Sequence, residues 1–169
     1  MTPSRPLIVP DLLRRQVERN PERIAVVVDG HGEMTFAQWD QRADRIARQL
    51  ISCDLQPGDR VGLMFSNGDG LDYLAGYIGI HKAGCVAVPL NTRYRHGELR
   101  HVLTHCGASV VVCGAEYSTL LKEAVGETGI ILLDPAQLKV DPTDEGEGFV
   151  PVQRNPDDLA DILYTSGTT

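Results

Sequence analysis

The chain has 169 residues, 42% of them apolar, which is enough for one domain with a substantial core. Its 23 acidic and 16 basic residues give a formal net charge of −7. This charge argues against nucleic acid or an anionic membrane surface as a partner, because both are bound through excess Lys and Arg. The longest apolar runs are interrupted by Gly, His or Asp, so we expect no membrane span, and residues 1–10 are too weakly apolar for a secretory signal.

We expect a cytoplasmic protein whose four cysteines are buried free thiols, because none of them forms a CxxC pair: Cys53, Cys85, Cys106 and Cys113. His101 and His105 are four residues apart on one predicted helix and could in principle share a metal. No third ligand is near them in the sequence, so we interpret both as part of a solvated polar face.

The N-terminal part predicts a helix over residues 11–19, followed by a hairpin whose strands cover residues 24–28 and 33–35. Thr35 and Gln38 have the spacing of a capping box, which predicts the start of a second helix. Apolar residues then recur at helical spacing as far as residue 50.

From residue 57 the pattern alternates between strands and helices. Apolar strands are expected at residues 60–65, 85–90, 110–113 and 130–133, and helices at residues 71–83, 98–106 and 117–125. Each of these helices is followed by a glycine, namely Gly84, Gly107 and Gly126. Helix–glycine–strand repeats of this kind predict an α/β fold with a largely parallel sheet and flanking helices.

The C-terminal part divides into a connection and a strand with a loop. Residues 139–158 are rich in Pro, Gly and acidic side chains, which predicts a surface linker. Residues 159–164 are an apolar run and predict a short buried strand. Five hydroxyl or glycine residues then follow it, namely Thr165, Ser166, Gly167, Thr168 and Thr169.

This last loop has the chemistry of a phosphate cradle. Gly167 allows the backbone to approach an anion, and the hydroxyls of the other four residues add neutral donors. Ser/Gly/Thr clusters are also common in plain surface turns, and the spacing here is not that of the GxxxxGK[ST] loop. Composition alone therefore leaves a phosphate site and a surface turn both open.

The motifs resemble those of adenylate-forming enzymes, the superfamily of acyl- and aryl-CoA synthetases, peptide-synthetase adenylation domains and luciferases. Tyr164-Thr-Ser-Gly-Thr-Thr169 is similar to the opening of the family's phosphate-binding signature, and His81-Lys-Ala-Gly-Cys-Val-Ala-Val-Pro-Leu-Asn91 is similar to a second signature. The likeness extends to Met34–Gln38 and to Pro57–Val61. It implies that residues 1–169 form an incomplete N-terminal domain of such an enzyme. Pro89-Leu90-Asn91 and Glu98-Leu99 look more like CoA synthetases than peptide synthetases.

The resemblance implies ATP-dependent activation of a carboxylic acid through an acyl-adenylate, followed by thioester formation with CoA. It implies ATP, Mg²⁺ and CoA as ligands, with Thr165, Ser166, Gly167, Thr168 and Thr169 on the ATP phosphates. Arg93 occupies the position of an Arg that contacts a CoA phosphate in some CoA ligases, but it also fits a solvated turn. The family's catalytic residues lie further along, so the resemblance places none in these 169 residues, and we expect this piece alone to be inactive in adenylation.

Three alternatives stay open. The acceptor thiol could be the pantetheine arm of a carrier protein that is loaded with an amino or aryl acid. The chain could be a non-catalytic scaffold for binding or assembly, or an unrelated nucleotide-binding α/β protein. An open sheet edge also makes association into a homo-oligomer an expectation.

Overall fold

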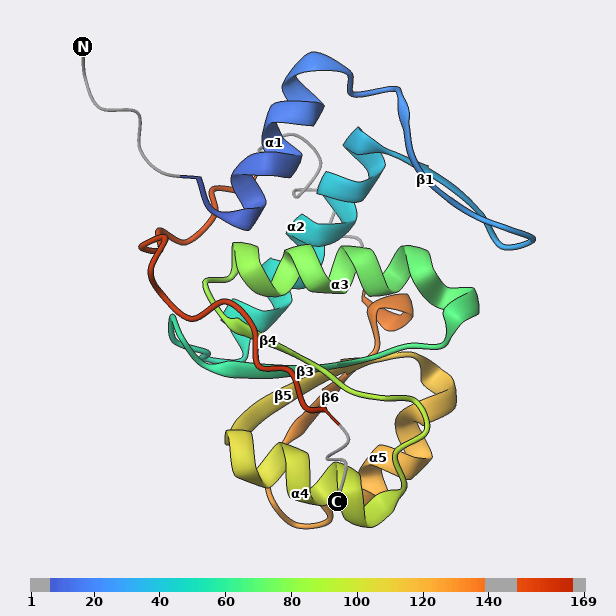
Figure 1. Ribbon diagram of the computed structural model, residues 1–169, viewed down its shortest axis with the longest axis vertical. Coiled ribbons are helices and arrows are strands. Elements are labelled where there is room, and N and C mark those ends of the chain that lie inside the picture. The colour runs from blue at the N-terminus through green and yellow to red at the C-terminus, as the bar shows by residue number, and fades with distance from the viewer. Residues whose placement is uncertain (1–6, 139–148, 166–169) are drawn as a thin grey trace.

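The computed structural model describes residues 7–138 and 149–165 and has three layers (Figure 1). Helices α1 (Val9–Arg19), α2 (Phe36–Ser52) and α3 (Gly70–Lys82) lie on one face of a sheet, and α4 (His96–Cys106) and α5 (Ser118–Val125) lie on the other. The sheet contains β3 (Arg60–Met64), β4 (Val86–Pro89), β5 (Ala108–Cys113) and β6 (Ile131–Leu133). A separate antiparallel hairpin pairs β1 (Ile24–Val28) with β2 (Gly32–Thr35). The α/β fold predicted from the sequence is confirmed.

The four-stranded sheet is parallel throughout, with the order β4-β3-β5-β6. The chain moves outward from β3 to β4, returns past β3 to β5, and continues to β6. This order puts α3 on the face opposite α4 and α5, as in doubly wound folds. Alternate residues of a strand point to opposite faces, and β5 shows this clearly: Val110 and Val112 belong to the core under α2 and α3, whereas Val111 and Cys113 belong to the core over α4 and α5.

We call the layer formed by α1, α2 and α3 the upper layer, after its place in Figure 1. Within it, α2 and α3 cross closely at a glycine. A methyl group added at Gly79 of α3 would lie 2.8 Å from Cβ of Ile46 and 2.9 Å from the carbonyl oxygen of Ala43, both on α2. Only a residue without a side chain allows this approach. Trp39 packs at the edge of the same layer, as core filling, and its indole N–H donates to the carbonyl oxygen of Leu74 at 3.0 Å.

The predicted helix termini are largely confirmed. The Thr35 hydroxyl accepts from the N–H of Gln38 at 3.2 Å, and the Gln38 side chain accepts from the N–H of Thr35 at 2.9 Å, which completes the capping box. Gly107 ends α4 with φ +65°, a left-handed conformation that glycine adopts without strain. Helix α1 begins two residues earlier than predicted, because Pro10 is compatible with the first helical turn, and α4 likewise begins at His96 rather than Glu98.

The predicted linker, residues 139–158, lies partly outside the described residues. Its described part, residues 149–158, contains no helix or strand. Two of its backbone N–H groups form hydrogen bonds with the upper layer. The N–H of Phe149 donates to Asp44 at 3.2 Å, and the N–H of Val152 donates to the carbonyl oxygen of Lys82 at 2.8 Å.

Candidate functional site

The segment that leads to Thr165 runs along the outer edge of β4. The N–H of Ala87 donates to the carbonyl oxygen of Ala160, and the N–H of Ile162 donates to the carbonyl oxygen of Ala87, both at 2.9 Å. The pairing is parallel, with Ala87 opposite Asp161. The segment therefore passes from this bridge toward the carboxyl end of β4, the end at which open α/β sheets bind ligands.

The prediction of a buried strand over residues 159–164 is wrong. The structure contains a single bridge at Asp161 and no strand there, and Leu159 and Leu163 are 57% and 71% exposed. Within the described residues the segment is paired on one side only, by β4. An apolar run indicates an extended segment, but it does not reveal how many neighbours cover that segment.

The candidate site residues are only partly within the described structure. Thr165 is exposed, immediately after Tyr164. Ser166, Gly167, Thr168 and Thr169 lie outside the described residues.

Arg93 is exposed in the turn that follows β4, where its N–H donates to the Asn91 side chain at 3.0 Å. In the same turn the Tyr94 hydroxyl donates to the carbonyl oxygen of Tyr164 at 3.5 Å. The structure thus brings the turn that carries Arg93 beside the residue that precedes Thr165, although the two are far apart in the sequence.

On the α3 face, Asp161 lies beside two side chains, Tyr77 and His81, to which the sequence assigned no role in a site. The Tyr77 hydroxyl donates to Oδ2 of Asp161 at 3.0 Å. Nε2 of His81 lies 3.5 Å from Oδ1 of Asp161, and neither of these atoms has a hydrogen-bond partner among the described residues. Burial lowers the pKa of His81 against the opposing effect of the Asp161 charge, and burial together with Asp161 raises the pKa of Tyr77 to about 12. Both groups are therefore neutral at pH 7, so neither carries a positive charge that could bind an anion.

On the α4 face, Tyr164 is held by His105. Nδ1 of His105 and the Tyr164 hydroxyl share a hydrogen bond of 2.6 Å, and the two rings meet edge to face with centroids 5.7 Å apart. The phenol donates when Nδ1 carries no proton, and the imidazole donates when it does. His101 and His105 are both exposed, as predicted, but His105 is not simply solvated.

A buried ion cluster lies above the sheet in the upper layer. The Lys82 ammonium, 2% exposed, donates to Asp40 at 2.7 Å and also to Asp44. Burial raises the pKa of Asp44, although the hydrogen bond from Lys82 opposes this. Nothing in the sequence spacing identified Asp40 and Asp44 as partners of Lys82.

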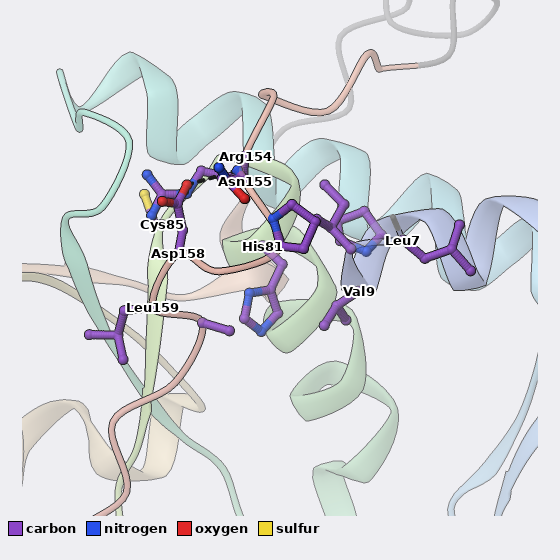
Figure 2. Close-up of a pocket in the computed structure, with 12 residues that line it drawn as sticks. Leu7, Val9, His81, Cys85, Arg154, Asn155, Asp158 and Leu159 are labelled. Carbon is purple, nitrogen blue, oxygen red and sulfur yellow. Dashed lines mark hydrogen bonds and ion pairs between the residues drawn. The ribbon is translucent and has the colours of Figure 1, made fainter. Parts of the chain in front are cut away.

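A cavity of about 140 Å³ lies between the start of α1 and residues 154–160 (Figure 2). His81 and Cys85 line it, and so do Arg154 and Asp158, which form an ion pair at 3.2 Å. Burial raises the pKa of the Cys85 thiol to about 11, so this group is an unreactive thiol at pH 7. Because Cys85 precedes β4, the cavity lies at the amino end of that strand, away from Thr165.

All four cysteines are free, with Cys85 and Cys113 buried and the other two half-buried. Residues 7–138 and 149–165 contain no cluster of three or more His, Cys, Asp or Glu side chains suited to a metal ion. Among the same residues, none of the helices combines the length and the apolar character that crossing a bilayer requires.

The sheet is doubly wound, and the segment that ends at Thr165 passes toward the carboxyl end of β4, where folds of this class bind their ligands. Residues 13–169 match the AMP-binding enzyme family. The chain therefore belongs to this family, and it corresponds to the N-terminal portion of its adenylate-forming members.

Similar proteins include both peptide synthetases and a CoA synthetase. The chain is 32% identical over 165 residues to surfactin synthase subunit 2 of Bacillus subtilis (strain 168), a match that covers 95% of this chain and 4% of that protein. Among solved structures, it superimposes on a fatty acyl CoA synthetase of Mycobacterium tuberculosis with a TM-score of 0.76 and 27% identity, covering 93% of this chain and 32% of that one. The peptide synthetase FmoA3 in its AMPPNP-bound form gives a TM-score of 0.76 and 28% identity, over 93% of this chain and 16% of that one. The chain thus spans a small part of each relative.

Proposed function

We propose that the protein activates a carboxylic acid with ATP and transfers the acyl group to the thiol of CoA. A carboxylate oxygen attacks the α-phosphorus of ATP, the bond to the bridging oxygen breaks, and pyrophosphate leaves with the electron pair. The sulfur of CoA then attacks the acyl carbon, the thiol proton is lost, and AMP leaves. This proposal concerns the whole protein, of which these residues supply one wall of the site.

The role we propose for this part of the chain is to hold the leaving phosphates. Thr165, Ser166, Gly167, Thr168 and Thr169 would contact the β- and γ-phosphates through main-chain N–H groups and hydroxyls. In-line displacement at the α-phosphorus needs positioning and charge stabilisation more than a nucleophilic side chain, and such donors supply both. Mg²⁺ bound with ATP would add charge neutralisation. The observation that supports this role most is the parallel pairing of Asp161 with Ala87, which directs the segment to the carboxyl edge of β4.

Two acceptors are supported by different observations. CoA is favoured by Pro89-Leu90-Asn91, by Glu98-Leu99 and by the exposed Arg93 in the turn beside Tyr164. A carrier-protein pantetheine is favoured by the likeness to peptide synthetases. The two acceptors are distinguished by incubating the protein with its acid and ATP, and then with either CoA or a pantetheinylated carrier protein. Transfer to CoA predicts a soluble acyl-CoA, and acylation of the carrier protein alone would contradict CoA as the acceptor.

The adenylation step is tested by acid-dependent exchange of labelled pyrophosphate into ATP. We would assay the full protein product of the gene against amino acids, aryl acids and fatty acids, with the 169-residue chain beside it. Exchange stimulated by at least one acid is expected for the gene product, and none for the 169-residue chain. Absence of exchange with every acid, in a folded protein that still binds ATP, would contradict the proposal.

Thr165→Val tests the loop in the same assay, because it removes one hydroxyl and keeps the shape of the side chain. It should raise the KM for ATP by about two- to tenfold, which corresponds to the free energy that one hydrogen bond usually contributes. Thr128→Val is the matched control, since Thr128 is also exposed but precedes β6 at the opposite end of the sheet. Equal effects of the two variants would remove Thr165 from the proposed site.

A further inference from the structure

The segment before Thr165 is held from both faces of the sheet. Ile162 and Tyr164 pack with the cluster over α4 and α5, whereas Asp161 contacts Tyr77 and His81 on α3. This alternation is that of an extended chain, whose successive side chains point to opposite faces. Its hydrogen bonds to β4 stop at Ile162, so the contacts of Tyr164 are what hold the chain between that bond and Thr165.

We infer that His105 is a positioning residue for the backbone N–H of Thr165, and that it acts by holding the ring of Tyr164. The bond from Nδ1 of His105 to the Tyr164 hydroxyl, 2.6 Å long, fixes the end of the phenol, and the edge-to-face contact of the two rings fixes its tilt. The functional importance of the loop rests on the proposed function. The contact between His105 and Tyr164 is observed independently of that proposal.

The backbone of Tyr164 transmits this restraint to Thr165. The carbonyl group of Tyr164 and the N–H of Thr165 belong to one planar peptide unit, so fixing the direction of one fixes the other. The Tyr94 hydroxyl, which donates to that carbonyl oxygen at 3.5 Å, contacts the same unit directly. The ring and the carbonyl group of Tyr164 are thus both restrained. The N–H of Thr165 is therefore held in one direction, as a hydrogen-bond donor to an anion must be.

The chain offers a matched control for His105. His101 lies one turn earlier on α4 and is also exposed, and its ring centroid is 5.7 Å from that of His105. Among the described residues, the hydrogen bonds and the ring contact of Tyr164 come from His105 and Tyr94, and not from His101. His101→Ala therefore removes an imidazole from the same helix face and leaves both hydrogen-bond partners of Tyr164 in place.

The first measurement concerns the contact alone and needs no nucleotide. In the isotope-labelled 169-residue chain, Tyr164→Phe should shift the ring nitrogen signals of His105, and both Tyr164→Phe and His105→Ala should shift the amide signal of Thr165. His101→Ala should leave the Thr165 amide signal in place. An unchanged Thr165 signal in both of the first two variants would overturn the inference.

The second measurement separates positioning from mere structural support. In pyrophosphate exchange by the gene product, His105→Ala should raise the KM for ATP by about two- to tenfold, with a smaller effect on kcat. His105→Asn should recover most of this loss, because its side-chain amide reaches the place of Nδ1, and His101→Ala should match the wild type. Equal losses in the Ala and Asn variants would overturn the inference, whereas a wild-type protein that binds ATP without exchange would overturn the proposed function and leave the contact to be decided by the first measurement.

Discussion

The two faces of the sheet are built in different ways. The described residues contain four buried polar or charged side chains, and all of them belong to the layer of α1, α2 and α3: Asp11, Asp44, His81 and Lys82. The core between the sheet and α4 and α5 consists of aliphatic side chains such as Leu99, Leu103 and Val111, together with the neutral thiol of Cys113. Both cores are therefore apolar, but only the one under α1, α2 and α3 also contains buried polar and charged side chains.

The difference is explained by the chain segments that the upper layer binds. The buried groups of the upper layer bind chain segments that are remote in sequence: Asp44 accepts from Phe149, the carbonyl oxygen of Lys82 accepts from Val152, and His81 faces Asp161. Apolar packing stabilises without direction, whereas a hydrogen bond depends on the direction of donor and acceptor and so fixes a partner in place. Apolar side chains support the sheet on both faces, and we interpret the upper face as the one that also fixes the path of the C-terminal segment.

Removing the buried cation should have the largest effect. Lys82→Met leaves Asp40 and Asp44 without their ammonium partner, and breaking a buried pair of this kind costs about 3 to 5 kcal/mol. Urea unfolding measures the loss. The double variant Lys82→Met/Asp44→Leu should recover part of it, because the buried charge of Asp44 is gone; a Lys82→Met chain as stable as the wild type would show that the ion cluster is dispensable.

On the face covered by α4 and α5, Leu103→Ala should cost about 2 to 5 kcal/mol, because the side chain is 1% exposed and its loss leaves a cavity. The same unfolding measurement applies. We expect this loss to be the same at pH 6 and pH 8 within about 0.5 kcal/mol, since the variant removes no titrating group. A strong pH dependence would mean that the two faces are not distinct.

The close crossing of α2 and α3 predicts an intermediate effect. Gly79→Ala should destabilise by about 1 to 3 kcal/mol, because the added methyl group would contact Ile46 and the backbone of Ala43. Gly97→Ala on α4 is the matched control: nothing lies within 4 Å of its added methyl group, and alanine favours the helix by about 0.5 to 1 kcal/mol. If both substitutions stabilise the chain, the tight packing assigned to the upper layer is wrong.

The smallest expected effect is a pH dependence that arises from His81. Burial lowers its pKa below the ordinary value of 6.5, so the unfolded chain binds this proton more readily than the folded chain does. Its contribution to stability is therefore full above about pH 6.5 and is lost as the pH falls below that value. Urea midpoints at several pH values should show this loss in the wild type and less of it in His81→Gln. A stability that increased on acidification through this range, in the wild type but not in His81→Gln, would reverse the sign that we assign.

Much of the fold could be predicted because its signals are local. The glycines after α3, α4 and α5, the capping box at Thr35 and the short apolar strands each act within a few residues. Together they define a βαβ alternation, and hence a parallel sheet. The order of the strands and the crossing at Gly79 depend on packing between distant segments, and no local pattern contains that information.

The site was predicted less completely, for the same reason. The hydroxyl-rich sequence from Thr165 identified the candidate loop, but the contact between His105 and Tyr164 joins residues that are 59 positions apart. The apolar run before the loop led to an incorrect strand, because Leu159 and Leu163 are exposed where the sequence pattern indicated burial. Lys82 was recognised as part of a helix end, yet its partners Asp40 and Asp44 come from another helix.

The most direct test of the central claim is a titration of the isotope-labelled 169-residue chain with magnesium ATP, followed at the amide of Thr165. The account predicts a saturable shift of this signal and of its neighbour Tyr164, with no shift at Thr128, which precedes β6 at the other end of the sheet. Saturable binding that shifts signals elsewhere and leaves Thr165 unchanged would contradict it.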